Sequence, residues 1–115
     1  MLLTNDLSAL LIIIPIFMIS IALHEAAHAY SAAYFGDDTP AKEGRLTINP
    51  IAHLDLMGTL MLVMAGFGWG KSVNVDPRNL RNPGLHMPLI AAAGPFANLL
   101  LVIVSLLLMK LVSGS

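Results

Sequence analysis

The sequence predicts an all-α integral membrane protein in which transmembrane helices are joined by a short re-entrant or strand-containing segment. Three observations support this class. The 115 residues are 57% hydrophobic and only 11% charged, whereas soluble domains carry about 25% charged residues. Two apolar blocks, residues 7–35 and 85–112, are each long enough to cross a hydrocarbon core of about 30 Å. The stretch between them holds most of the charged residues.

This length predicts one membrane-embedded domain over residues 1–115, and the composition predicts a multi-pass protein of the cell membrane. The net charge of −1 gives no indication of a nucleic-acid partner. The absence of Cys excludes disulfides and thiolate zinc ligands.

The first apolar block is expected to form a helix over residues 7–35. Residues 4–6 (Thr-Asn-Asp) offer helix N-caps, and Gly36 is a natural stop. Pro15 should kink this helix, because it removes one backbone hydrogen bond. No Lys or Arg precedes the block, which argues against a cleavable signal peptide.

The same block contains the sequence His24-Glu25-Ala26-Ala27-His28. Residues four apart lie on one helix face, so both imidazoles can reach one zinc ion and Glu25 can reach a water beside it. Ionisable groups inside a membrane helix are rare and usually functional. The alternative is a chance match in which both histidines bond to neighbouring helices. Ser20 and Ser31 share this face and are candidates to orient the ligands or to bond carbonyls of their own helix.

The polar middle, residues 36–84, is rich in turn residues. Residues 45–48 (Arg-Leu-Thr-Ile) are candidates for a short strand. Residues 58–70 are apolar but too few for an ordinary crossing, so we expect a re-entrant or interfacial segment there. Pro77 and Pro83 exclude a long helix in the stretch that follows.

The last apolar block is expected to form a second transmembrane helix over residues 85–112. Gly94 and Pro95 interrupt it and predict a packing kink. Asn98 lies one turn further on, and an amide in this position commonly bonds a neighbouring membrane helix. Lys110 lies near the end of the block, where its side chain can extend to an interface.

The distribution of Lys and Arg predicts the orientation. Most of them lie between the two apolar blocks, at Lys42, Arg45, Lys71, Arg78 and Arg81. The positive-inside rule therefore places the middle in the cytoplasm and both termini outside. This prediction requires that residues 51–70 do not cross the membrane.

Several motifs together resemble the site-2 protease family of intramembrane zinc metalloproteases, and more narrowly its compact prokaryotic branch. They occur in the family's order between about residue 20 and residue 105. They are His24-Glu25-Ala26-Ala27-His28, Asn49-Pro50-Ile51-Ala52-His53-Leu54-Asp55 with Gly58, Phe67-Gly68-Trp69-Gly70-Lys71, Pro77-Arg78-Asn79 and Gly94-Pro95-Phe96-Ala97-Asn98.

The resemblance implies an enzyme with bound Zn²⁺ that hydrolyses peptide bonds in membrane-spanning segments of other proteins. It implies His24 and His28 as zinc ligands, Glu25 as the general base, and Asn98 near the substrate or the developing oxyanion. The expected partners are a membrane-spanning protein substrate and the lipid bilayer.

The third zinc ligand is the point at which the sequence departs from the family. A catalytic zinc takes three protein ligands and keeps one open position. Family members supply the third from an Asp-Gly motif on a later helix, and this chain contains no Asp-Gly pair. We therefore expect this chain to correspond to the front part of the family's core and to be weakly active or inactive alone. Asp55 and His53 are weak candidates for the third ligand, and loop-anchoring hydrogen bonds are their alternative role; self-association or a partner chain could also complete the site.

Three interpretations remain open from the sequence: an intramembrane zinc protease, a non-catalytic relative that binds zinc or substrate, and a small structural membrane protein with a chance motif. Metal analysis separates the third from the others, and proteolysis of a membrane-helix substrate separates the first from the second.

Overall fold

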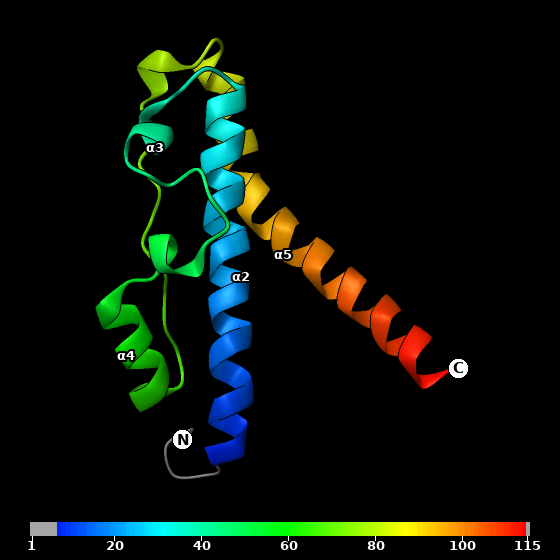
Figure 1. Ribbon diagram of the computed structural model, residues 1–115. Coiled ribbons are helices and arrows are strands. Elements are labelled where there is room, and N and C mark those ends of the chain that lie inside the picture. Colours follow the sequence, from blue (N-terminus) through cyan, green and yellow to red (C-terminus); the bar gives the residue numbers. More distant parts are fainter. Residues whose placement is uncertain (1–6, 115) are drawn as a thin grey trace.

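The computed structural model describes residues 7–114, and its regular elements are all helical. In chain order they are α2 (Leu7–Tyr34), α3 (Thr39–Lys42), η1 (Pro50–His53), α4 (Leu56–Ala65), η2 (Pro77–Asn79) and α5 (Pro83–Ser113). Figure 1 shows α2 along most of the molecule, with α3 and α4 beside it and α5 leaving the C-terminal end of α2 at an angle. The predicted all-α class is confirmed for these residues, and the predicted N-caps at residues 4–6 lie outside them.

α2 and α5 have the length and apolarity of helices that cross a membrane. Their 28 and 31 residues span about 42 and 46 Å at 1.5 Å per residue. Their most apolar windows have mean hydropathies of 2.5 and 2.3, and only 6% and 0% of those windows are buried. Core helices of soluble domains are mostly buried, whereas apolar helices left uncovered fit a lipid environment.

One face of α2 is built from small residues. Ala22, Ala26, Ala29 and Ala32 are almost completely buried, and α2 packs mainly against α5 and η1. Small side chains let neighbouring backbones approach closely, which is a common basis of helix association in membranes.

The C-terminal end of α2 is tied to the start of α5. Gly36, with a φ of +114°, ends α2 as predicted. Arg81 then returns to this end: its backbone N–H donates to the carbonyl of Phe35 at 3.3 Å, and its guanidinium donates to the carbonyl of Tyr34 at 2.8 Å. These bonds satisfy carbonyls that a helix leaves unpaired at its C-terminus. His86 of α5 stacks on Phe35 with ring centroids 4.1 Å apart.

Both long helices continue through their internal prolines. α2 contains Pro15, and α5 contains Pro88 and Pro95. The interruption expected at Gly94 and Pro95 is therefore not a break in the helix, because an internal proline removes a single backbone hydrogen bond while the flanking turns stay helical. The stretch before Pro83 contains no long helix, as predicted. Pro83 itself occupies the first turn of α5, where a missing N–H costs nothing.

The short strand considered at residues 45–48 is wrong. The segment bends at residues 46–47, and Arg45 turns inward, where it is only 3% exposed. Its guanidinium donates to the His53 ring and to the carbonyls of Lys71 and Ser72. Hydrogen bonds donated by a buried guanidinium therefore organise this region in place of a strand ladder.

α4 and the residues after it form a closed excursion. An isolated antiparallel bridge joins Leu54 to Gly70, so the segment ends beside the place where it began. α4 has ten residues and spans about 15 Å, half of a hydrocarbon core. Gly66, with a φ of +88°, caps its C-terminus. In the view of Figure 1, α4 is level with the N-terminal half of α2.

Candidate metal centre

α2 brings the three motif residues together as the helical spacing predicts. Within residues 7–114, His24, Glu25 and His28 form the one group of potential metal ligands, with one ligand atom from each lying within 4.8 Å of the others. The two imidazoles make an edge-on contact with centroids 4.7 Å apart. Glu25 is only 8% exposed, whereas both histidines are half-buried, so the group is partly covered by the protein.

Asn98 on α5 fixes the orientation of the His24 ring. The amide Oδ1 lies 2.6 Å from His24 Nδ1, and the amide nitrogen donates to the carbonyl and the hydroxyl of Ser20 at 3.0 and 2.8 Å. A carbonyl can only accept a hydrogen bond, so the amide nitrogen faces Ser20 and Oδ1 faces His24. His24 Nδ1 must then donate, which in the neutral imidazole leaves the lone pair on Nε2.

Glu25 has the same effect on the second histidine. His28 Nδ1 lies 3.1 Å from Glu25 Oε1, and an ionised carboxylate only accepts. The proton of His28 is therefore on Nδ1. His28 Nε2 is buried and has no hydrogen-bond partner among the described residues.

These observations test whether the residues fit zinc. A buried ring nitrogen without a partner is unfavourable unless something binds it. Both histidines present an Nε2 lone pair, and each donates its other nitrogen to an oxygen, the arrangement typical of metal-ligating histidines. Two imidazoles and a carboxylate also match the ligand preferences of zinc. The donor set therefore fits Zn²⁺. With Glu25 in the role of general base, which the resemblance implies, the group supplies two of the three protein ligands of a catalytic zinc.

The weak candidates for that third ligand have other partners. His53 is fully buried, with Nε2 2.6 Å from the carbonyl of Thr47 and Nδ1 3.1 Å from Arg45 Nη2. Asp55 Oδ2 accepts from the backbone N–H of Gly58 and from the indole of Trp69. Neither residue joins the group of His24, Glu25 and His28. These hydrogen bonds anchor loops, which is the alternative role that the sequence allows for His53 and Asp55.

The two serines differ in their contacts. Ser20 holds the Asn98 amide and so acts on His24 through that amide. Ser31 instead donates to the carbonyl of His28 on its own helix, at 3.1 Å. The sequence signal for this pair is an amide in one apolar block and a histidine in the other. That signal alone could not have paired Asn98 with His24, because no local sequence pattern determines the depth at which α5 meets α2.

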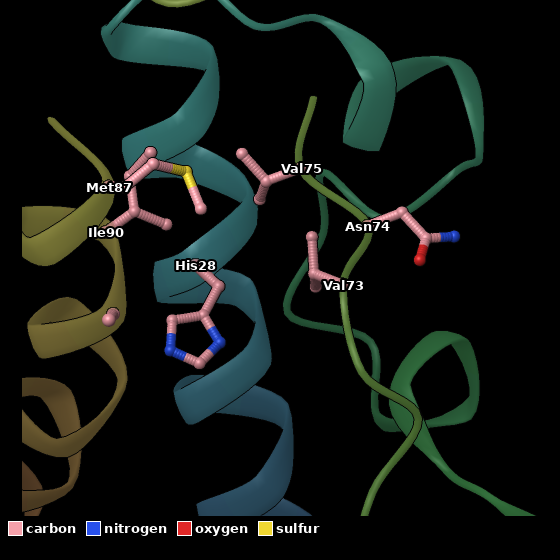
Figure 2. Close-up of a pocket in the computed structure, with 7 residues that line it drawn as sticks. His28, Val73, Asn74, Val75, Met87 and Ile90 are labelled. Carbon is pink, nitrogen blue, oxygen red and sulfur yellow. The ribbon is translucent and has the colours of Figure 1, made fainter. Parts of the chain in front are cut away.

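An open pocket of about 300 Å³ adjoins His28. Figure 2 shows the His28 ring between two walls, one from α5 with Met87 and Ile90, and one from the extended chain with Val73 and Val75. The side chain of Asn74 points away from this pocket and donates to Glu43. The walls are thus mainly apolar.

The fold and the site define a class: a helical chain, suited to a membrane, that carries a His-Glu-His group whose donor atoms fit a zinc ion. The chain is 47% identical over 94 residues to a protein named "Putative zinc metalloprotease YwhC" of Bacillus subtilis (strain 168), a match that covers 82% of this chain and 43% of that protein. It is 29% identical over 102 residues to "Putative zinc metalloprotease Rip2" of Mycolicibacterium smegmatis (strain ATCC 700084 / mc(2)155), covering 84% of this chain and 39% of that protein. These matches confirm the predicted resemblance: the chain is related to proteins named as zinc metalloproteases.

The chain spans less than half the length of the curated relatives that it matches. No protein-family model and no solved structure matches it.

Proposed function

We propose that this chain carries the zinc-binding core of an intramembrane metalloprotease that hydrolyses peptide bonds in membrane-spanning proteins. One observation carries the proposal: His24 and His28, on a helix apolar enough to cross a membrane, both have their Nε2 atoms freed for a metal, with Glu25 beside them. The names of the two relatives support zinc and proteolysis.

Zinc bound at this site would polarise the scissile carbonyl and acidify a water. Glu25 is the group that would accept the proton of that water and pass it to the leaving amine. Its carboxylate lies on the same helix face as both imidazoles and is nearly buried. Its Oε1 lies 3.1 Å from His28 Nδ1, and the second carboxylate oxygen can accept the bond from water.

The proposed role of Asn98 has two parts. Its amide orients His24, through the contacts described above. An additional role as a donor to the oxyanion of the substrate would require the amide nitrogen to give up its bonds to Ser20. The substrate chain would reach the zinc beside the apolar pocket next to His28, where an apolar side chain of a membrane segment fits the lining.

A third strong ligand would come from outside this group, either from a further segment or from a partner chain. The three grouped residues include Glu25, and a glutamate used as a permanent ligand is not free to act as a base. We therefore propose that the 115-residue chain alone has little or no proteolytic activity.

The metal site is tested by purifying the protein in detergent and measuring zinc. We expect zinc in the parent and in Glu25→Gln, and none in the His24→Ala, His28→Ala double variant. Equal zinc in the parent and the double variant would refute the site.

Hydrolysis is tested with a membrane-spanning peptide, using the chain alone and the chain co-expressed with the part of YwhC that it does not match. We expect cleavage that needs the added part and is abolished by Glu25→Gln. Robust zinc-dependent cleavage by the chain alone would refute the need for an external ligand, and cleavage by Glu25→Gln would refute the role of the base.

A second candidate function is a relative that binds zinc or substrate without cleaving it. The observation that favours it is that the described group contains two imidazoles and the carboxylate of Glu25 but no other ligand. Zinc binding without cleavage in both arms of the assay would support this second function.

A further inference from the structure

Gly94 lies on α5 one turn before Asn98 and is buried against α2. A Cβ placed on Gly94 would lie 2.5 Å from His28 Nε2, 2.7 Å from His24 Nε2 and 2.8 Å from His24 Cε1. Its three nearest neighbours would therefore all be imidazole atoms. Two of them are the nitrogens whose lone pairs the hydrogen bonds at Nδ1 leave free.

The imidazoles have little freedom to move away from such a Cβ. Asn98 holds the His24 ring, and Glu25 holds the His28 ring. The rings also contact each other, with centroids 4.7 Å apart. A side chain at position 94 would have to displace both rings and break the bonds that orient them, rather than shift one flexible chain end.

The surrounding sequence makes glycine an unexpected choice for this position. Residues 91–93 are all alanine, and alanine is the more favourable residue inside a helix. Glycine in such a place is typical of close approach by another group. Helix flexibility next to Pro95 would be another explanation, but it does not account for the two ligand nitrogens that face Gly94.

We propose that Gly94 is a positioning residue of the metal centre: because it has no side chain, both Nε2 atoms can face one zinc ion, and any side chain there excludes the ion. The inference rests on the proposed zinc site and extends it. It makes α5 a wall of the site as well as the source of the Asn98 amide.

The first test compares zinc binding in detergent by the parent, Gly94→Ala and Gly84→Ala. Gly84 is the matched control, since it lies on the same helix and a Cβ there would meet only Asn82 Oδ1, at 3.9 Å. We expect Gly84→Ala to bind like the parent and Gly94→Ala to lose at least tenfold in zinc affinity. Equal affinity in Gly94→Ala and the parent overturns the inference alone, whereas a parent without zinc overturns the proposed function and the metal role of Gly94 together.

The second test needs no metal, and it still tests the inference if the Gly94→Ala variant folds poorly. Thermal unfolding of the metal-free protein is measured for Gly94→Ala in the parent and in the His24→Ala, His28→Ala background. We expect a lower midpoint in the parent background and an unchanged or higher midpoint once both rings are gone, because the three nearest neighbours of the new methyl are ring atoms. An equal fall in both backgrounds overturns the inference.

Discussion

The tautomer of each neutral imidazole in the site is set by a single neighbouring atom. Asn98 Oδ1 faces His24 Nδ1 and Glu25 Oε1 faces His28 Nδ1, so both rings keep an Nε2 lone pair. A zinc ligand must be a neutral imidazole with the correct nitrogen free. The oxygens behind the rings therefore prepare the site for a metal.

Asn98 is predicted to control zinc affinity through this bond. Asn98→Ala should weaken zinc binding by about 10–100-fold, the usual effect of losing an oxygen behind a ligating histidine. Asn98→Asp should retain more affinity than Asn98→Ala, because a carboxylate still accepts from His24 Nδ1. The affinities are measured by competition with a chromophoric chelator. Ser20→Ala, which removes only the hydroxyl at the other end of the amide, is the control with a small effect; equal losses in both Asn98 variants would contradict this prediction.

Asp37 is a second residue on which many contacts depend, and it lies outside α2 and α5. It is fully buried and accepts from the backbone and hydroxyl of Thr39, from the Asn79 amide and from the backbone N–H of Asp76. Burial opposes ionisation, but these hydrogen bonds outweigh it and lower the pKa of Asp37 below its ordinary value. The carboxylate thus joins the turn after α2 to the segment that leads into α5.

The lowered pKa of Asp37 predicts a loss of stability in acid. Above the unfolded-state value, about 3.9, its charged form stabilises the folded state. That stabilisation falls as the pH drops through the unfolded and then the folded pKa, because the unfolded chain takes up the proton first. Asp37→Asn should lower the free energy of unfolding at neutral pH by about 1–3 kcal/mol and flatten its dependence on pH below about 4. Unfolding curves at several pH values check this, and an unchanged acid dependence in Asp37→Asn would contradict it.

At the level of elements, sequence patterns located the long helices well. The apolar blocks at residues 7–35 and 85–112 correspond to α2 and α5 within a few residues, because uninterrupted apolar runs are a local signal. The His-Glu-His spacing likewise predicted which side chains meet on α2. The turn of Arg45 toward His53 could not be predicted, since it depends on contacts with Lys71 and Ser72, which lie far along the chain.

The glycines of the α4 excursion show the same limit of local patterns. A Cβ on Gly58 would lie 2.1 Å from the carbonyl oxygen of Trp69, and one on Gly68 would lie 2.3 Å from the carbonyl oxygen of Gly58. The returning chain therefore packs directly on α4 through positions without side chains. Nothing in the residues near Gly58 indicates that Trp69 will return to it.

Gly58→Ala is predicted to displace the returning segment. The new methyl would meet backbone rather than a flexible side chain, so we expect a loss of about 1–3 kcal/mol in stability, typical of overpacking. Trp69 is the single tryptophan of the chain, and its fluorescence emission should change with the substitution. Met57→Ala, on the exposed side of α4, is the control; an emission spectrum that changes equally in both variants would argue against the packing described here.

On the scale of the whole molecule, three contacts bear on the topology that we propose for the chain. Arg81 ties the start of α5 to the end of α2. The Leu54–Gly70 bridge brings the two ends of the α4 excursion together. A Cβ on Gly70 would lie 2.3 Å from Ile21 Cγ2, so the base of this excursion is level with Ile21 on α2. We therefore propose that α4 enters the membrane beside α2 and leaves on the side from which it entered.

This arrangement predicts two full crossings, by α2 and α5, with residues 38 and 78 on one side and residue 113 on the other. The Lys and Arg residues between the helices favour the cytoplasm for that first side. The chain has no cysteine, so single cysteines at Asp38, Arg78 and Ser113 can be labelled with an impermeant reagent in intact cells. Ser113→Cys should react from outside, and the other two should react only after the cells are opened. Labelling of Asp38→Cys and Arg78→Cys from opposite sides would mean that residues 51–70 cross the membrane, and α5 could then not run antiparallel to α2 with Asn98 beside His24.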